Sequence, residues 1–409
     1  LHLKKIAAHL PGSTSSETTF RTIKGWLNEC TISHKCRHGN SKHGHDQRAS
    51  PKRLLQIIDD KVILKENVGQ QPYACLSYCW GESAQIIQTK QDTIEHRRKS
   101  IPWNQLNATF QDAITVCRHL EISYLWIDAL CIIQDSDEDW KEQASQMANI
   151  YANAYLTIAA TNSSDASGGC FRNTSEEYMS KLLPGYKDTY TRQKLPKLPL
   201  MSDEAAIGES PNWPLLSRGW AYQEMRLSPR VLHFCAQEVV WVCRVSQKSE
   251  SMDNDEDLTS KGAWNSMVYP YVPYSVLEKD PQSLWYRTVD EYSRLRLSKE
   301  EDKMAALSGL AEQMQHLRLG DRYLVGLWEK TLLVDLLWHP TRHNVVSKAR
   351  IARYPSWSWA SSPFQVQWFF GVNQALKCTR IDDIEVINRG PSHLADCIEA
   401  RITLRAPLL

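Results

Sequence analysis

Hydrophobic residues form short continuous runs along the chain, separated by stretches in which apolar positions recur every three or four residues. The runs at 73–79, 124–133 and 154–160 have the length of buried β-strands. Between the first two runs, apolar residues repeat at helical spacing over 104–121, and Asn104 or Asn107 is the candidate N-cap. These elements predict an alternation of strand and helix.

A second helix is expected between the second and third runs. Ser136 and Asp139 match a capping box, and Trp140, Met147 and Tyr151 follow on one face of that helix. The complete order β-α-β-α-β predicts an α/β fold, with a parallel sheet covered by helices on both faces. A short helix before Pro229 and the apolar segments RVLHFC and EVVWVCR then predict a small β-hairpin.

The pattern divides the chain into four parts. Residues 1–50 are expected to be irregular apart from a short helix, 51–245 to form the α/β core, and 246–282 to be a surface loop region. Residues 283–409 are expected to be helical with short strands and to pack on the core, because their apolar surface needs cover.

Three finer expectations concern the second half of the chain. The acidic stretch 249–258 predicts a surface loop with solvated carboxylates. The segment 323–338 is apolar almost all round, which predicts a buried helical stretch. In 354–363, Trp alternates with Ser, as in a half-buried strand or an extended segment.

Composition narrows the class of protein. The 409 residues include 48 Lys+Arg and 47 Asp+Glu, for a net charge of +1, so neither nucleic acid nor a charged membrane surface is expected as a partner. No apolar run reaches the roughly 18 residues of a membrane span. The 11 cysteines are odd in number and no signal peptide precedes them, which favours a reducing, cytoplasmic setting.

Tryptophan is unusually frequent, with 15 Trp and 16 Tyr against 7 Phe. Trp80, Trp126 and Trp140 could wall a ligand, but packing in the core is the more ordinary role of an indole. The choice stays open from the sequence.

Cys30, His34 and Cys36 form the strongest candidate for a metal site. Zinc prefers cysteine and histidine at short spacings, but this spacing is not that of a standard finger and no CxxC pair follows. We therefore expect a solvated loop and no bound metal. The signature loops of dinucleotide folds, P-loops, zincins and nucleophile elbows are absent from the sequence as well.

Four linked motifs resemble the heterokaryon incompatibility (HET) domain of filamentous fungi. They are YACLSYCWG at 73–81, LWIDALCIIQD at 125–135, the segment 139–160, and LLSRGWAYQE at 215–224. The resemblance implies a role in non-self recognition that leads to growth arrest or cell death, through self-association or other signalling partners.

HET domains have been likened to TIR domains, which share a flavodoxin-like sheet and in several cases cleave NAD. This likeness implies a flavodoxin-like or TIR-like core, with NAD as a substrate. In TIR enzymes the catalytic glutamate lies four residues after a tryptophan, and Trp220 and Glu224 have that spacing here. TIR enzymes usually carry cysteine after the tryptophan, where this chain has Ala221.

The chemistry of NAD cleavage needs few groups. Nicotinamide leaves as a neutral molecule, so the main demand is a carboxylate that stabilises positive charge on the ribose, and Glu224 is the candidate. Trp220, one helical turn away, offers a flat face to a ring. An ion pair of Glu224 with Arg218 or Arg226 is the structural alternative.

Further candidates follow the predicted strands. Asp128 lies in an apolar run and is either a second catalytic carboxylate or part of a structural salt bridge. Ser77 and Gln134 follow strands where ligands bind in parallel sheets, although such residues more commonly satisfy loop backbone. We expect one cleft to bring together a set of ligand-binding and catalytic residues, namely Ser77, Trp80, Asp128, Gln134, Arg218 and Glu224.

Two functions remain open at this level. One is a signalling and cell-death effector, with or without NAD cleavage. The other is a tailoring enzyme of fungal secondary metabolism that acts on a small molecule.

Overall fold

A computed structural model describes ten segments of the chain, namely 8–34, 36, 50–81, 86–199, 212–253, 255–258, 280–341, 350–368, 379–388 and 397–406. The chain divides into two compact units. The first comprises Leu1–Ser217 with Glu224–Val272, and the second Arg218–Gln223 with Pro273–Leu409. The division passes through one helix, α7 (Gly219–Leu227).

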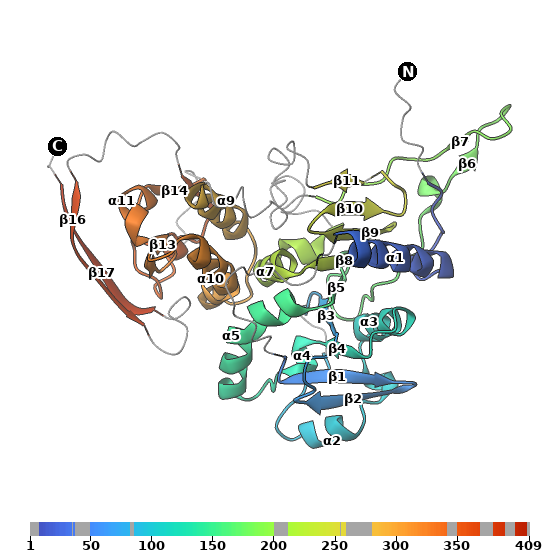
Figure 1. Ribbon diagram of the computed structural model, residues 1–409, viewed down its shortest axis with the longest axis horizontal. Coiled ribbons are helices and arrows are strands. Elements are labelled where there is room, and N and C mark those ends of the chain that lie inside the picture. The colour runs from blue at the N-terminus through green and yellow to red at the C-terminus, as the bar shows by residue number, and fades with distance from the viewer. Residues whose placement is uncertain are drawn as a thin grey trace. The chain divides into compact units, whose positions relative to one another are not determined.

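A mixed sheet organises the first unit, and its described strands stand in the order β11-β10-β9-β8-β5-β3-β4-β1-β2 (Figure 1). The strands are β1 (Arg53–Ile58), β2 (Lys61–Glu66), β3 (Ala74–Ser77), β4 (Tyr124–Trp126), β5 (Leu156–Ala159), β8 (Arg230–Phe234), β9 (Val239–Cys243), β10 (Ser246–Ser249) and β11 (Glu256–Asp257). A separate two-stranded ribbon is formed by β6 (Lys181–Leu182) and β7 (Tyr190–Thr191).

The centre of the sheet is parallel. Strand β3 pairs in parallel with β4 on one side and β5 on the other, and β5 pairs in parallel with β8. The outer strands β1, β2, β9, β10 and β11 are antiparallel to their neighbours. Counted along the chain, the parallel strands run 2-1-3-4, which is the start of the flavodoxin-like order. The predicted α/β fold and the β8–β9 hairpin are therefore confirmed.

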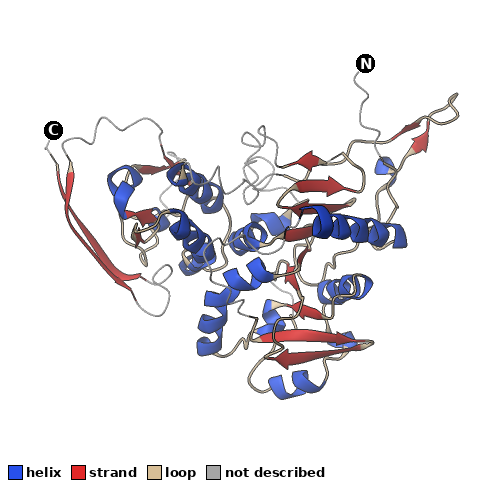
Figure 2. Ribbon diagram, in the orientation of Figure 1, coloured by secondary structure: helices blue, strands red, loops and turns tan. Residues whose placement is uncertain are grey.

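Helices cover both faces of this sheet (Figure 2). They are α1 (Glu17–Glu29), α2 (Ile94–Lys99), α3 (Ala108–His119), α4 (Asp128–Cys131) and α5 (Asp137–Asn153). Tyr78 packs edge-on against Phe110 of α3 at 5.1 Å, whereas the thiol of Cys75 faces Ile150 of α5. Because neighbouring residues of a strand point to opposite faces, α3 and α5 lie on opposite sides of β3.

The expected strand over 124–133 is wrong in its second half. Strand β4 ends at Trp126, and Asp128–Cys131 form the short helix α4. Asp128 and Cys131 therefore do not lie within a strand. The run gave no helical signal because Ala129, Leu130 and Cys131 are buried on all sides of this single turn.

Helix starts were better predicted than helix faces. Asn107 is the N-cap residue of α3, and Ser136 accepts the N–H of Asp139 at 3.3 Å at the start of α5. Trp140, however, is exposed, so it does not belong to the buried face of α5.

The described residues among the first 66 form more helix and strand than expected. Residues 1–50 include the three-turn helix α1, whose N-cap is Ser16, and 53–66 form the β1–β2 hairpin. The hairpin turns at Asp59, which has φ 46°.

The acidic stretch 249–258 is not a fully solvated loop. Ser249 ends β10, Glu256 begins β11, and the Glu250 side chain is only 7% exposed. The sequence shows that the stretch is acidic, but it does not show which carboxylate accepts hydrogen bonds from buried donors. The expectation failed for that reason.

The second unit combines helices with short hairpins. Its remaining helices are α9 (Pro281–Ser293), α10 (Ser308–Leu317) and α11 (Leu332–Asp335), and its paired strands are β12 (Tyr323–Leu324) with β13 (Leu327–Trp328), β14 (Trp338–Pro340) with β15 (Val366–Trp368), and β16 (Arg380–Asn388) with β17 (Cys397–Arg405). Buried Trp285, Trp328 and Trp359 dominate its core. The packing of this part on the α/β core stays a prediction.

Two expectations in the second unit are wrong. The segment 323–338 is not continuously helical, because Val325 and Gly326 adopt positive φ values of 46° and 96° and turn the chain into the β12–β13 hairpin. In 354–363, Trp359–Ser361 form a 3-10 turn in place of the expected strand. Its Ser358 side chain bonds Val325 O at 2.6 Å, a tertiary contact that the alternation of Trp and Ser could not show.

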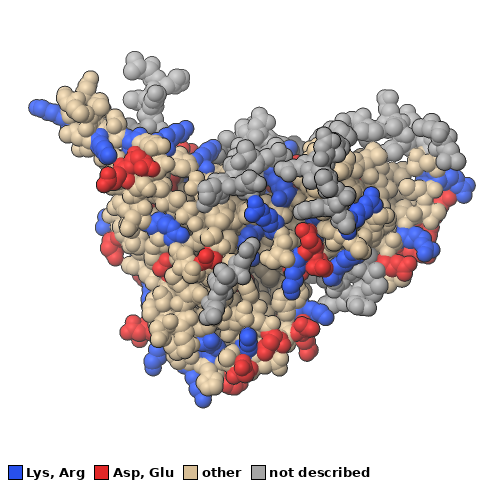
Figure 3. All heavy atoms as spheres, turned by 180° about the vertical axis from the view of Figure 1, so that it is seen from behind, with Lys and Arg blue, Asp and Glu red and all other residues tan. Residues whose placement is uncertain are grey.

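Helices in the described segments are all too short or too polar to cross a membrane. On the face drawn in Figure 3, acidic and basic side chains are interspersed. That distribution agrees with the near-zero net charge.

Candidate functional site

The carboxyl ends of β3 and β5 form the switch point of the parallel sheet. From β3 the chain goes to β4 on one side, and from β5 it goes to β8 on the other. The loops therefore diverge at this edge, which is where open α/β sheets bind ligands. Ser77 ends β3 and is paired in register with Ala159 of β5.

Ser77 and Glu224 are in direct contact at this edge. The Ser77 hydroxyl donates a hydrogen bond to Oε2 of Glu224, and the two residues are 1% and 5% exposed. A buried carboxylate needs donors or a counter-charge, so this contact is one reason that Glu224 is tolerated inside the fold.

Tyr151 of α5 connects Glu224 electrostatically with Asp128. Its hydroxyl donates to Leu76 O at 3.0 Å. Burial, followed by the charges of Glu224, Cys75 and Asp128, raises the pKa of Tyr151 well above its usual range. Tyr151 therefore remains a neutral hydrogen-bond donor near pH 7.

Asp128 is held by a bracket of donors, which come from the segment after β3 and from residues 129–134 next to Asp128 itself. Tyr78 Oη donates to its Oδ1 at 2.8 Å and Trp80 Nε1 to its Oδ2 at 2.8 Å, while the Ala129 N–H also reaches Oδ1 at 2.7 Å. Gln134 Nε2 donates to the carbonyl of Asp128 at 3.0 Å. Asp128, Trp80 and Gln134 are half-buried, so the bracket fixes a carboxylate that still reaches solvent.

Arg218 and Trp220 belong to the second unit. Trp220 Nε1 donates to Asp302 Oδ2 at 3.4 Å, and Arg218 forms a β-bridge with Arg296. Trp220 and Glu224 lie one turn apart in α7, as their spacing predicts. The shared cleft with Arg218 stays a prediction, and so does the alternative ion pair of Glu224.

A buried histidine at the same end of the strands was not among the residues predicted from the sequence. His233 of β8 is registered with Ala159, and its Nδ1 lies 2.9 Å from Thr161 Oγ1. Burial lowers the pKa of His233 to about 3, so its ring is neutral near pH 7. Its position in an apolar strand resembled that of an ordinary core residue, and the sequence carried no signal for it.

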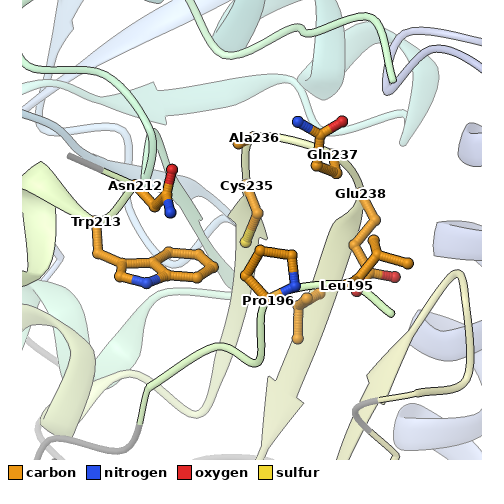
Figure 4. A pocket seen from close by; sticks show the side chains of 9 residues that line it. Leu195, Pro196, Asn212, Trp213, Cys235, Ala236, Gln237 and Glu238 are labelled. Atoms are coloured by element: carbon orange, nitrogen blue, oxygen red, sulfur yellow. The ribbon is translucent and has the colours of Figure 1, made fainter. Parts of the chain in front are cut away.

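A small hollow opens at the carboxyl end of β8 (Figure 4). Its wall includes Leu195, Pro196, Trp213 and Cys235. The Cys235 sulfur points toward the Trp213 ring, whereas Gln237 points away. Burial raises the pKa of Cys235 well above its usual range, so this thiol is no nucleophile.

The N-terminal Cys/His segment requires a correction. The sequence showed no standard zinc spacing and no CxxC pair, but Cys243 at the end of β9 lies beside Cys30, His34 and Cys36. The expected solvated loop is therefore wrong for Cys30 and Cys36, which are buried. The fourth ligand was missed because its separation of more than 200 positions hides it from any local motif.

The first unit is thus an α/β domain of flavodoxin-like strand order, with a buried carboxylate at its switch point. Residues 73–224 match the family model described as Heterokaryon incompatibility protein (HET). This match confirms, over residues 73–224, the resemblance to HET domains that the four motifs predicted. Searches among curated proteins and among solved structures gave no match.

Proposed function

We propose that this HET-domain protein is a signalling effector of heterokaryon incompatibility, and that its α/β unit cleaves the bond between nicotinamide and ribose in NAD. The observation that carries the proposal is the buried Glu224 carboxylate, held by Ser77 at the switch point of the sheet. The family match begins at Tyr73 in front of β3 and ends at Glu224, so it spans both partners of this contact.

The reaction makes one main electrostatic demand. As the C–N bond breaks, its electron pair goes to the nicotinamide nitrogen and positive charge develops on the ribose. Water then attacks the ribose carbon and loses a proton, giving nicotinamide, ADP-ribose and H⁺. Glu224 would stabilise the ribose charge, and the Ser77 hydroxyl would hold the carboxylate in position.

Other residues have supporting roles in this proposal. Asp128 is the second carboxylate, and Tyr78 and Trp80 limit its movement by hydrogen bonds of 2.8 Å each. Gln134, which bonds Asp128 O, would accept or donate to the substrate from the same loop. Trp220 is the proposed stacking face, and Arg218 is a proposed cation for the diphosphate.

The cellular role follows from the family. Heterokaryon incompatibility in fungi acts through arrest or death of fused cells, and self-association or a signalling partner would switch the effector on. The described cysteines form no disulfide, which supports a reducing, cytoplasmic site of action.

The test is nicotinamide release from NAD by the purified full chain, measured by chromatography in both dilute and concentrated, self-associated protein. Glu224→Gln keeps the volume and removes the charge, and we expect it to lower the rate by about 10²–10³. Glu138→Gln, which changes an exposed carboxylate of α5, is the matched control and should retain the rate.

Two results would count against the proposal. Equal rates in wild type and Glu224→Gln would remove Glu224 from the mechanism. No release in any assembly state would end the NAD hypothesis, and a small-molecule binder found by thermal shift would then favour a tailoring enzyme.

A further inference from the structure

A helix end and a strand end bring four sulfur and nitrogen ligands together in the first unit. Helix α1 ends at Glu29 and continues as a π-helical turn, Cys30–His34, after which Cys36 follows. Strand β9, beside α1 in Figure 1, ends at Cys243. The wide turn places Cys30 and His34 on the side that faces this strand end.

The geometry is that of a nearly closed tetrahedral site. The potential ligand atoms of Cys30, His34, Cys36 and Cys243 all lie within 4.8 Å of one another, and Cys243 Sγ is 3.4 Å from His34 Nδ1. With Zn–S bonds of about 2.3 Å and Zn–N bonds of about 2.0 Å, neighbouring ligands around zinc are about 3.5–3.8 Å apart. A contraction of about 1 Å or less would close the shell.

Groups outside the four ligands are arranged as around a bound metal. His34 directs Nδ1 at Cys243, and its Nε2 lies 3.7 Å from the Glu29 carboxylate, which Lys248 also contacts. A carboxylate on the far nitrogen of a ligating histidine selects the tautomer whose near nitrogen is free to bind. The Ser246 N–H donates to Cys243 Sγ at 3.4 Å, which favours a thiolate.

Arg230 balances the charge of such a site. Its side chain is 2% exposed, and its Nε donates to Cys30 Sγ at 3.4 Å. Its Nη1 donates to Tyr155 O at 3.0 Å, whereas its Nη2 has no hydrogen-bond partner among the described residues. Zn²⁺ with three thiolates and a neutral histidine carries a net charge of −1, which a buried Arg230 neutralises.

Two other uses of these thiols fit less well. Cys30, Cys36 and Cys243 are 0%, 4% and 0% exposed, which is typical of structural cysteines and not of the partly exposed thiolates that act as nucleophiles. A disulfide would use only two of the three sulfurs and leave Arg230 beside neutral groups, and the structure forms none.

We propose that Cys30, His34, Cys36 and Cys243 bind one structural Zn²⁺ that ties the end of α1 to the end of β9. All four positions belong to the protein, so the shell is complete and the metal has no open position for catalysis. The site lies outside the family match of 73–224 on both sides, and it links two segments 209 positions apart. It therefore fixes the N-terminal segment to the antiparallel side of the sheet, at the end of β9.

The first test uses the wild-type full chain, expressed with zinc and dialysed against a weak chelator. We expect about one zinc per chain by elemental analysis. Replacement by Co²⁺ should give the visible bands of tetrahedral cobalt and a thiolate-to-cobalt band in the ultraviolet. A chain with no zinc and no cobalt spectrum overturns the proposal, as does a Cys30–Cys36 disulfide in protein purified with reductant.

Variants test the ligand set. Cys243→Ser should lower the zinc content at least tenfold, whereas Cys235→Ser, which changes a buried cysteine of the same hairpin outside the cluster, should retain it. His34→Cys keeps four ligands and should retain metal with a cobalt spectrum shifted by the additional thiolate. A Cys243→Ser variant that folds normally and still binds about one zinc per chain would exclude this site.

Discussion

The Ser77 hydroxyl and the Glu224 carboxylate meet across 147 positions of sequence, and their hydrogen bond joins the two ends of the family match. Ser77 ends the first parallel strand, and Glu224 lies in the helix that precedes the last one. This one hydrogen bond therefore joins the end of β3 to helix α7 and also holds the carboxylate of the candidate site in position.

Replacing Ser77 separates these two roles. Ser77→Ala leaves a buried carboxylate oxygen without its donor, so we expect a loss of about 1–3 kcal/mol in the free energy of unfolding. Under the proposed function it should also slow nicotinamide release. Ser228→Ala is the matched control, because Ser228 is buried and bonds the Glu224 carbonyl at 2.6 Å, not the carboxylate. Urea unfolding and the NAD assay measure the two effects, and identical losses of rate in both variants would contradict the positioning role.

The bracket around Asp128 should behave as one coupled unit. Tyr78→Phe and Trp80→Phe each remove one donor to a charged acceptor, and each should cost about 1.5–3 kcal/mol. In a double-mutant cycle with Asp128→Asn, each should show a coupling energy of about 0.5–3 kcal/mol. Trp140→Phe changes an exposed indole and should shift stability by less than about 0.5 kcal/mol. Additive losses throughout would mean that the hydrogen bonds do not form in solution.

Arg53 and Asp139 form a buried ion pair that holds β1 to α5. Arg53 is 1% exposed, bonds Asp139 Oδ2 and also donates to Cys131 O at 2.6 Å. Burial alone would raise the pKa of Asp139, but Arg53 and the Ile133 N–H bring it below its ordinary value. Asp139→Asn should cost about 3–5 kcal/mol, because it leaves the buried guanidinium with only the more distant Glu66 carboxylate, at 3.8 Å, as a counter-charge.

The surface pair beside it supplies the control for that measurement. Glu142→Gln removes the exposed partner of Lys52 and should cost no more than about 1 kcal/mol. Both values come from chemical denaturation followed by circular dichroism. A loss in Asp139→Asn as small as in Glu142→Gln would show that Arg53 reaches water.

Glu250 should make stability fall as pH rises. Its carboxyl accepts from Thr19 Oγ1 at 2.7 Å and from Val239 N at 2.8 Å, and burial raises its pKa from 4.5 to about 7. A carboxyl with a raised folded-state pKa holds its proton more tightly when folded, so its contribution is present below about pH 4.5 and is lost up to about pH 7. Glu250→Gln mimics the protonated form and should remove up to about 3 kcal/mol of this decline.

The comparison must be made between variants, because His233 acts in the opposite direction. Burial lowers its pKa from 6.5 to about 3, so stability is lost as pH falls through that window. The difference between wild type and Glu250→Gln at about pH 5 and about pH 8 isolates the carboxyl. Exposed Glu176→Gln should leave the pH profile unchanged, and an unchanged profile in Glu250→Gln would place Glu250 in water.

Local signals located most of the first unit. The apolar runs identified β3, β4 and β5, and the caps at Asn107 and Ser136 marked the starts of α3 and α5, because strand period and capping depend on nearby residues. The same signals failed at α4 and at the β12–β13 hairpin. Both segments are buried on all sides, so their sequences lack the regular spacing of polar residues that distinguishes a helix from a strand.

The sequence by itself determined that the chain forms an α/β domain and that residues 73–224 carry the HET motifs, because both depend on the order of residues along the chain. It also supplied Ser77, Asp128 and Glu224 as candidates. Only the tertiary structure decided which groups meet: Ser77 with Glu224, Tyr78 and Trp80 with Asp128, and Cys243 with the N-terminal Cys/His segment. The physical reason is that strand order in a sheet brings together residues whose separation along the chain exceeds any local pattern, and burial then selects which polar groups must be paired.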